Sequence, residues 1–402
     1  MRAIGSCRWP GQRREHGEIE GVSSSSTSSA LPGPERAGGL APPGVDLGRR
    51  IRAAAEAGGL RGVPAGPARV EPLGSGESYT AWLVRSGSTA RVVRVPRREP
   101  HQMPRPMAAE LAVLQQVPPR LGTSAVAAEA GTDNILGVPY MVVTHVPGRV
   151  LRARDWGPGP ARALAAQIAR LHLALAAPGA AAPALPDADA SGPAPVPSAS
   201  REGRTLLSWW REHHPRTLRD PRVVPLLDPW RRALERLDPA FEGVPTHPLI
   251  HGDAVLTNIV LAPDGTPRFI DFEWAGPGDP AKDLALIGGR VVGGPWYAPM
   301  GRPEIAAFVT EYAGCLRRLG AEAAQTGAVS QARPRYGNRP TWEADARTAD
   351  PQRLLARRDA WELLDRLPNL LYCLSLAEQS PRHARWADDL AAGLGAVLAA
   401  GR

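Results

Sequence analysis

Lysine is almost absent from this sequence of 402 residues, since Lys282 is the only one and arginine supplies nearly all of the positive charge. Phenylalanine and tyrosine are also scarce, at 4 and 6 residues. The net charge of +8 is compatible with nucleic-acid binding. However, the arginines are scattered and no basic run alternates with stacking side chains. A generally basic surface is therefore the better interpretation, and we expect no nucleic-acid partner.

Cysteines and long apolar runs are few as well. Cys7, Cys315 and Cys373 lie far apart and match no spacing typical of a disulfide framework or a metal site. The nearest approach to a membrane-spanning stretch, Ala163–Ala177, is interrupted by an arginine and a histidine, and the amino terminus lacks the apolar segment of a signal peptide. We therefore expect a cytoplasmic protein with no membrane segment. The sequence does not indicate its oligomeric state.

The length of the chain suggests two lobes. Residues 1–62 are expected to form a disordered N-terminal extension, or a segment upstream of the true start codon, because the first 45 or so are rich in Ser, Gly and Pro. Within it, a helix without assigned function is expected from about Asp46 through Leu60. The ordered parts are then an N-lobe at 63–143 and a helical C-lobe at 144–402, with loops at 178–200 and 321–350.

Three polar residues form the central motif of the sequence. His251-Gly252-Asp253 is followed by four residues and then by Asn258, which is the spacing of the catalytic loop of protein kinases. Two short β-type runs follow Asn258 and precede Asp271, and Pro263-Asp264-Gly265 between them is typical of a hairpin turn. The hairpin would bring Asp271 beside Asn258. Such a pair of oxygen ligands suits Mg²⁺ that holds phosphates, with Asp253 placed to accept a hydroxyl proton.

The wider stretch resembles the aminoglycoside phosphotransferase and choline kinase group of small-molecule kinases. The matching pieces are the H-G-D and Asn258, then Ile270-Asp271-Phe272-Glu273, Gly278-Asp279-Pro280 and Asp283. This resemblance implies an α+β, bilobal protein-kinase-like fold with a small antiparallel-sheet N-lobe and a mostly helical C-lobe. It also implies an ATP- or GTP-dependent enzyme that transfers the γ-phosphate to an alcohol group of a small molecule. Asp253 would be the catalytic base, and Asn258 and Asp271 would hold Mg²⁺.

A glycine loop in the N-lobe is the expected phosphate cover. Gly74, Ser75, Gly76 and Ser78 lie between two runs of strand character, and glycines let backbone N–H groups approach phosphate oxygens closely. By itself the same sequence also fits an ordinary hairpin turn.

Arg94 stands where a protein kinase has the lysine that contacts the α/β-phosphates. Arginine gives a planar, bidentate phosphate contact, so the geometry there should differ. The kinase analogy pairs Arg94 with Glu110 on a helix over 106–117; otherwise the two are an exposed strand arginine and a solvated helix glutamate. The segment Gly137–Gly148 is either a core strand and turn or, as the resemblance implies, a hinge whose Thr144 and Val146 bind the adenine.

The remaining segments carry no motif. Helices are expected at 161–175, 206–219, 225–237, 304–319, 353–376 and 384–398, and His172 is expected to be a core hydrogen-bonding residue. Residues 204–240 contain more arginine than acidic residues, which favours a neutral or anionic acceptor such as a sugar, a nucleoside, a macrolide-like antibiotic or a metabolite. The resemblance implies an antibiotic, a sugar, an amino alcohol or a related metabolite as the acceptor. The missing lysine leaves open an alternative, a nucleotide-binding pseudokinase or scaffold without turnover.

Overall fold

The computed structural model describes residues 43–76, 78–100, 103, 105–175, 196–325 and 350–401, and these divide into two compact units. The described part of the N-terminal unit lies within 43–115 and 123–145. The C-terminal unit takes 146–401 and also the short segment 116–122, which the sequence did not indicate. Each unit is described by itself below.

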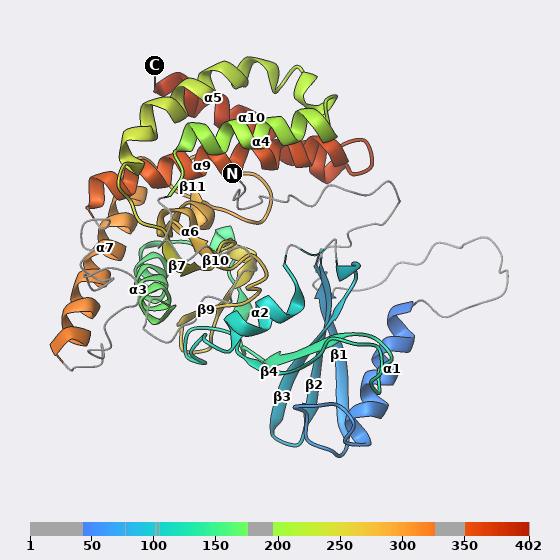
Figure 1. Cartoon of the computed structure of the whole chain (residues 1–402). Coiled ribbons are helices and arrows are strands. Elements are labelled where there is room, and N and C mark those ends of the chain that lie inside the picture. Colours follow the sequence, from blue (N-terminus) through green and yellow to red (C-terminus); the bar gives the residue numbers. More distant parts are fainter. Residues whose placement is uncertain are drawn as a thin grey trace. The chain divides into compact units, whose positions relative to one another are not determined.

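The N-terminal unit is built on one antiparallel sheet of five strands in the order β1-β2-β3-β5-β4 (Figure 1). The strands are β1 (Ala68–Ser75), β2 (Tyr79–Ser86), β3 (Thr89–Pro96), β4 (Ala125–Glu129) and β5 (Tyr140–Thr144). Alternate residues of the central strands are apolar and buried on one face, among them Val84, Val93 and Val142. This period of two is what a sheet with two different faces requires.

Helix α1 (Pro43–Glu56) packs on that apolar face and corrects one of our expectations. Ile51, Ala54 and Ala55 are buried against the sheet, and Leu60 follows them into the same core. The expected disordered extension of residues 1–62 is therefore wrong for its last twenty residues. The Ser- and Gly-rich composition ends before Pro43, whereas the apolar spacing of α1 supplies enough surface to be buried. Residues 1–42 lie outside the described part of the chain.

The C-terminal unit is mostly helical, as expected (Figure 1). Its helices are α3 (Pro158–Leu175), α4 (Ala199–His213), α5 (Val224–Leu237), α6 (Pro280–Ile287), α7 (Arg302–Gln325), α9 (Pro351–Leu376) and α10 (Pro381–Ala400). The main apolar core lies among α4, α5, α9 and α10, where Trp230 is buried and its indole N–H donates to the Leu363 carbonyl at 2.8 Å. Helix α4 begins inside the loop expected at 178–200 and ends at His213, before the short helical turn Thr217–Arg219.

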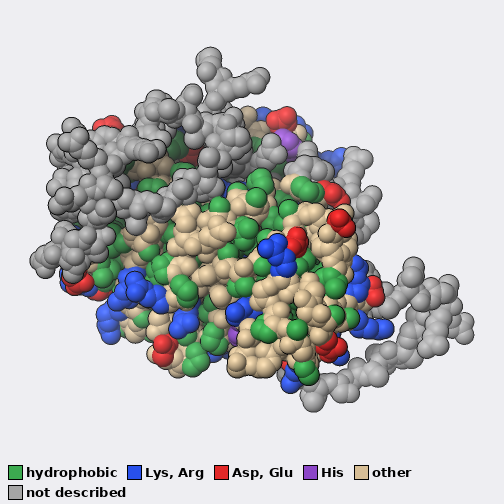
Figure 2. All heavy atoms as spheres, turned by 60° about the horizontal axis from the view of Figure 1, so that its bottom comes forward, with side chains coloured by type: hydrophobic (Ala, Val, Ile, Leu, Met, Phe, Trp, Pro, Cys, Tyr) green, Lys and Arg blue, Asp and Glu red, His purple; other side chains and the backbone are tan. Residues whose placement is uncertain are grey.

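Three small sheets complete this unit. They comprise β6 (Arg149–Val150) with β8 (Ile259–Leu261) and β9 (Pro267–Phe269), β7 (His247–Ile250) with β10 (Gly276–Gly278), and β11 (Gly288–Gly289) with β12 (Ala298–Pro299). Most of residues 178–200 and 321–350, expected as loops, lie outside the described residues. Among the helices that the structure describes, none is both long and apolar enough to cross a membrane. On the face drawn in Figure 2, basic and acidic side chains are interspersed.

The packing of α1 predicts a stability effect. Ile51→Ala should lower the free energy of unfolding by about 2–5 kcal/mol, because it removes a fully buried side chain between α1 and the sheet. Arg52→Ala, one residue further along the same helix and exposed, should change it by less than about 0.5 kcal/mol. Urea denaturation of both variants measures the difference. Equal stability of the two would mean that α1 does not contribute to this core.

Candidate active site

The hairpin of β8 and β9 brings Asn258 next to Asp271. The strands pair antiparallel with Ile259 opposite Phe269, and the backbone N–H of Ile270 donates to the Asn258 carbonyl at 2.9 Å. Gly265 closes the turn with φ 81°, a conformation that glycine adopts without strain. The strand-turn-strand reading of the sequence is therefore correct in its geometry, and residues thirteen positions apart become neighbours.

Asp271 is held in an unusual backbone conformation. Its φ is 64°, and it is the one non-glycine residue with positive φ in the described part of the chain. A side-chain-bearing residue in the left-handed region costs about 1–2 kcal/mol, although aspartate tolerates it better than most. Strain of this kind persists where the surrounding structure determines it, and it is concentrated at functional sites. This conformation turns the chain as it leaves β9, at the position of the Asp271 carboxylate in the sequence motif.

Asp253 and Asn258 form a second close contact. The Asn258 amide nitrogen donates to the Asp253 carboxylate at 2.7 Å and to its backbone carbonyl at 3.0 Å. With the nitrogen so engaged, the amide oxygen is the atom left to face a cation. Burial and the negative charges of Asp271 and Asp365 raise the pKa of Asp253 to about 7, whereas Lys282 and the Asn258 bond act in the opposite direction.

These donors fit Mg²⁺. The Asp271 carboxylate and the Asn258 amide oxygen are hard oxygen ligands, and Mg²⁺ is commonly held by one or two protein oxygens together with phosphates and water. The mutual repulsion of Asp253 and Asp271 further favours a cation between nucleotide and protein. Among the described residues, no group of three His, Cys, Asp or Glu side chains forms a complete metal site. A Mg²⁺ ion held by Asn258 and Asp271 would need further oxygen ligands from outside the protein.

Asp283 holds the loop that carries His251, Gly252 and Asp253. Its carboxylate is fully buried and accepts the backbone N–H of His251 at 2.7 Å and that of Gly252 at 2.8 Å. His172, also buried, contacts the same carboxylate at 3.0 Å and the Tyr312 hydroxyl at 2.7 Å. Burial alone would raise the pKa of Asp283, but the His172 hydrogen bond and the Gly252 N–H bring it below its ordinary value. His172 is thus the core hydrogen-bonding residue that we expected.

His251 supports the loop through contacts with the residues that follow β9. Its ring lies 4.5 Å from that of Phe272, Nε2 is 3.0 Å from the Ile270 carbonyl, and Nδ1 accepts the Asp253 N–H at 3.3 Å. The Ile270 carbonyl can only accept, so Nε2 carries the proton. Burial lowers the pKa of His251. His251 is therefore a neutral residue whose hydrogen bonds connect the loop of Asp253 to the end of the hairpin.

Gly252 explains why the motif has glycine at its centre. Its φ is 80°, and a Cβ at this position would lie 2.3 Å from the Trp274 carbonyl oxygen. Both the conformation and the space exclude a side chain.

Asp279 caps α6 by accepting the Ala281 N–H at 3.0 Å, and Arg357 and Trp361 from α9 donate to its other oxygen at 3.0 and 2.9 Å.

The N-terminal unit holds the predicted pair of Arg94 and Glu110. The guanidinium of Arg94 donates to the Glu110 carboxylate, and only 7% and 1% of these residues are exposed. Arg94 alternates with Val93 and Val95 along β3, so it points to the opposite face, where α2 (Met107–Leu114) presents Glu110. Arg94 also lies over the Tyr79 ring, 4.1 Å from its centroid. The exposed-arginine and solvated-glutamate readings are both wrong.

The glycine loop joins β1 to β2. Gly74 has φ 148°, and the Gly76 N–H donates to the Tyr79 carbonyl at 2.9 Å, so Gly74, Ser75 and Gly76 form a tight connection. Ser78 is 2% exposed, and its hydroxyl has no hydrogen-bond partner among the described residues. A buried hydroxyl without a partner in the protein is one that a ligand oxygen can satisfy.

Thr144 and Val146 fall on either side of the boundary between the two units. The Thr144 N–H donates to the Ser124 carbonyl at 2.9 Å, and its own carbonyl accepts the Thr123 hydroxyl at 2.9 Å. The N–H of Thr144 is therefore already used within the N-terminal unit, which the sequence did not reveal. Its carbonyl keeps a second lone pair.

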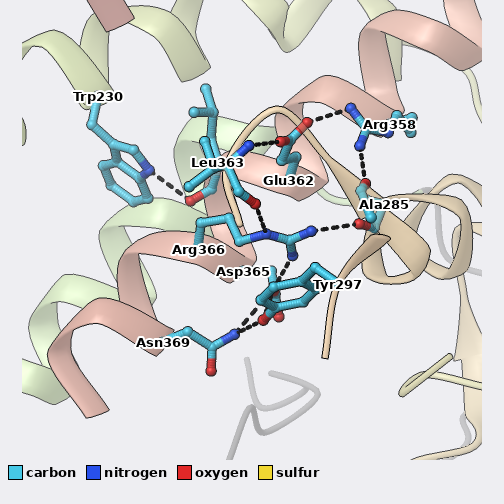
Figure 3. Close-up of polar contacts among 11 residues, drawn as sticks. Trp230, Ala285, Tyr297, Arg358, Glu362, Leu363, Asp365, Arg366 and Asn369 are labelled. Carbon is cyan, nitrogen blue, oxygen red and sulfur yellow. Dashed lines mark hydrogen bonds and ion pairs between the residues drawn. The ribbon is translucent and has the colours of Figure 1, made fainter. Parts of the chain in front are cut away.

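Sequence reasoning missed a cluster on α9 near Asp253. The Asp365 carboxylate accepts the Tyr297 hydroxyl at 2.7 Å and the Asn369 amide at 3.1 Å, and it pairs with the buried Arg366 (Figure 3). The negative charge of Asp365 contributes to the raised pKa of Asp253. A single aspartate on a long helix gives no local signal, since Asp365 and Asp253 are separated by more than a hundred residues.

The C-terminal unit has a hairpin that presents Asn258 and Asp271 beside the loop of Asp253. The N-terminal unit has a five-stranded sheet with a buried Arg–Glu pair. Together these features define a kinase-like phosphotransferase fold. The model of the phosphotransferase enzyme family (APH) matches residues 69–313, and the chain belongs to this family.

Two kinds of relatives agree with this assignment. Viomycin phosphotransferase of Streptomyces vinaceus is 32% identical over 171 residues, which make up 40% of this chain and 53% of that protein. The chain thus matches about half the length of this curated relative. The GDP complex of wild-type aminoglycoside 2'-phosphotransferase-IIIa shares the fold with a TM-score of 0.52 at 18% identity, covering 83% of this chain and 93% of that one. The GDP and kanamycin complex of APH(2")-IIIa has a TM-score of 0.50 at 19% identity and covers 83% and 92%.

Gly252→Ala should disrupt the loop through a backbone clash. We expect it to lower the free energy of unfolding by at least about 2 kcal/mol more than Gly265→Ala. Gly265 has nearly the same φ, 81°, but nothing lies within 4 Å of an added Cβ, so its variant carries only the strain of the left-handed conformation. Chemical denaturation of the two variants gives the comparison. A Gly252→Ala protein no less stable than Gly265→Ala would contradict the close packing against Trp274.

Proposed function

We propose that this protein transfers the γ-phosphate of ATP or GTP to a hydroxyl group of a small molecule. The observation that carries the proposal is the convergence of Asp253, Asn258 and Asp271 on one hairpin and its preceding loop. Membership of the phosphotransferase enzyme family supports it. So does the similarity to viomycin phosphotransferase, within the part of that protein that is matched.

In this proposal Asp253 orients the acceptor hydroxyl and takes its proton as the new oxygen–phosphorus bond forms. The bond from the γ-phosphorus to the β,γ-bridging oxygen breaks, and the nucleoside diphosphate leaves. Asn258 and Asp271 would hold Mg²⁺, which when bound neutralises charge on the phosphates. The protein needs to supply little beyond positioning and electrostatic stabilisation for such a transfer. His251 and Asp283 keep the Asp253 backbone in place through the bonds described above.

We propose that residues of the N-terminal unit contact the phosphates of the nucleotide. Arg94, fixed by Glu110, would contact the phosphates with its planar guanidinium. Gly74, Ser75, Gly76 and Ser78 would cover them, and the buried hydroxyl of Ser78 supports this role because it has no partner among the described residues. For the adenine or guanine base, the carbonyl of Thr144 and the backbone of Val146 are the proposed contacts.

The alternative of a pseudokinase without turnover is less well supported. It was suggested by the absence of the usual lysine at position 94. Arg94 nevertheless forms the buried pair with Glu110 that the lysine forms in the kinase analogy, and Asp253, Asn258 and Asp271 are all present. Incubation of the protein with Mg-ATP or Mg-GTP and a panel of hydroxylated compounds tests the proposal. Mass spectrometry should detect a phosphorylated compound together with the nucleoside diphosphate, whereas no product with any compound favours the pseudokinase.

Asp253→Asn should lower kcat by about 10²–10⁴, the range expected when a general base is removed. Asparagine keeps the size and the hydrogen-bond acceptor but cannot take the proton. Asp264→Asn, an exposed turn residue of the same hairpin, is the matched control and should keep full activity. Nucleotide affinity, measured by calorimetry, should be retained in both variants. Normal turnover by Asp253→Asn would remove this residue from the proposed mechanism.

Asp271→Asn tests the proposed magnesium site. The variant tolerates the left-handed backbone but lacks the charge, so the Mg²⁺ concentration for half-maximal nucleotide binding should rise about tenfold or more. Calorimetric titration of nucleotide at several Mg²⁺ concentrations reads this without turnover. Asp264→Asn again serves as the control. An unchanged Mg²⁺ requirement would show that Asp271 is not a ligand.

A further inference from the structure

A second arginine lies beside the glycine loop. Arg97 directly follows β3 and comes three residues after Arg94. Arg94 is buried and pairs with Glu110, whereas Arg97 is exposed. An exposed arginine after a strand is usually a solvated surface residue. Arg97, however, makes specific contacts with the loop.

Arg97 contacts the connection between β1 and β2 through two hydrogen bonds. Its guanidinium Nη1 donates to the Gly76 carbonyl at 2.7 Å, and its backbone N–H donates to the Ser78 carbonyl at 2.8 Å. Both accepting residues belong to the expected phosphate cover. Only the first bond depends on the arginine side chain, so a substitution can remove it and keep the second.

Pro96 explains why this contact falls on Arg97. Pro96 is opposite Tyr79 in the register of β2 and β3, but proline has no N–H to donate to the neighbouring strand. The next N–H along the chain, that of Arg97, donates to the Ser78 carbonyl instead. The backbone at the end of β3 is thus fixed against the glycine loop, which brings the Arg97 side chain to Gly76.

Two further hydrogen bonds of this loop stay within the hairpin of β1 and β2. The Gly76 N–H donates to the Tyr79 carbonyl at 2.9 Å, and the Ser75 and Thr80 hydroxyls lie 3.3 Å apart. Neither bond connects the tip of the hairpin to a third strand. The Arg97 side chain does so, and we therefore expect it to limit the movement of Gly76 relative to β3.

The charge of Arg97 is balanced differently from that of Arg94. Arg94 pairs with the Glu110 carboxylate, so the two charges largely cancel for a ligand at some distance. The partner of the Arg97 guanidinium is a neutral carbonyl, so this bond leaves the positive charge in place. The bond also engages an oxygen whose partial negative charge would repel a phosphate. Both effects make the loop more favourable for an anion.

We propose that Arg97 is a positioning residue for the nucleotide phosphates, which holds Gly76 in place and adds a positive charge beside the loop. The inference rests on the proposed function, because it takes Gly74, Ser75, Gly76 and Ser78 as the cover of the phosphates. A loop that is already ordered loses less conformational freedom when the ligand binds, so it binds the phosphates more tightly.

The test compares a nucleoside triphosphate with its nucleoside, by calorimetry and without turnover. The probes are the non-hydrolysable β,γ-imido analogues of ATP and GTP with Mg²⁺, and adenosine and guanosine. Arg97→Met should bind the preferred analogue about five- to tenfold more weakly than the wild type, because it lacks the charged donor to the loop. Affinity for the nucleoside, which has no phosphates, should not change, whereas a general loss of structure would weaken both. Higher salt should reduce the difference in triphosphate affinity.

Two variants and a second measurement separate this role from a general effect. Arg97→Lys keeps the charge and a donor of similar reach, and it should recover most of the lost affinity. Arg52→Met removes an exposed arginine from α1 and should match the wild type. Hydrogen exchange without nucleotide, read by mass spectrometry, should be faster for the peptide from Gly74 to Tyr79 in Arg97→Met and unchanged in Arg52→Met.

The possible outcomes distinguish this inference from the proposed function. Equal triphosphate affinity of Arg97→Met and the wild type overturns the inference and leaves the proposed function intact. A loss that is equally large for the nucleoside, or one that Arg52→Met shares, does the same. A wild type that binds no nucleotide overturns both. The expected loss of affinity in a protein that phosphorylates no compound would overturn the proposed function alone.

Discussion

The buried carboxylate of Asp283 is the group on which the proposed catalytic loop depends. A carboxylate with no exposure to water is stable only when donors satisfy it, because an unpaired buried charge costs several kcal/mol. Here the donors are two consecutive backbone N–H groups of the loop and the His172 ring from α3. Removing any of them would leave part of the charge uncompensated. The loop is thus held by its hydrogen bonds to one buried carboxylate and not by hydrogen bonds within its own turn.

The hydrogen bonds of Asp283 also fix the positions of the elements around the site. Gly252 donates to Asp283 and has φ 80°, and this conformation sets the direction in which the chain reaches Asp253. Helix α6, which carries Asp283, is fixed in turn by its cap Asp279, to which Arg357 and Trp361 of α9 donate. Arg366, further along α9, bonds the Ala285 carbonyl near the other end of α6. Helices α3, α6 and α9 therefore share the task of positioning one aspartate.

How far the sequence predicts this site depends on the range of the interactions. The hairpin and the aspartate loop follow from short-range signals, a Pro-Asp-Gly turn and a fixed spacing, and both are found in the structure. The Arg94–Glu110 pair follows from alternation along β3 and one helix nearby. By contrast, Asp365 and Tyr297 meet through tertiary packing that leaves no local trace. Helix α1 was underestimated because it follows a composition typical of disorder, although its own apolar spacing was visible.

The two sides of Asp253 differ in how their charges are balanced. Toward Asp271 the two carboxylates repel each other, and the proposed Mg²⁺ would offset this repulsion. Toward α9 the protein provides its own cation, since Arg366 pairs with Asp365. The negative charge of Asp365 is therefore already paired within the protein. In the proposed mechanism, the metal-bound nucleotide would therefore meet Asp253 on the side of Asp271.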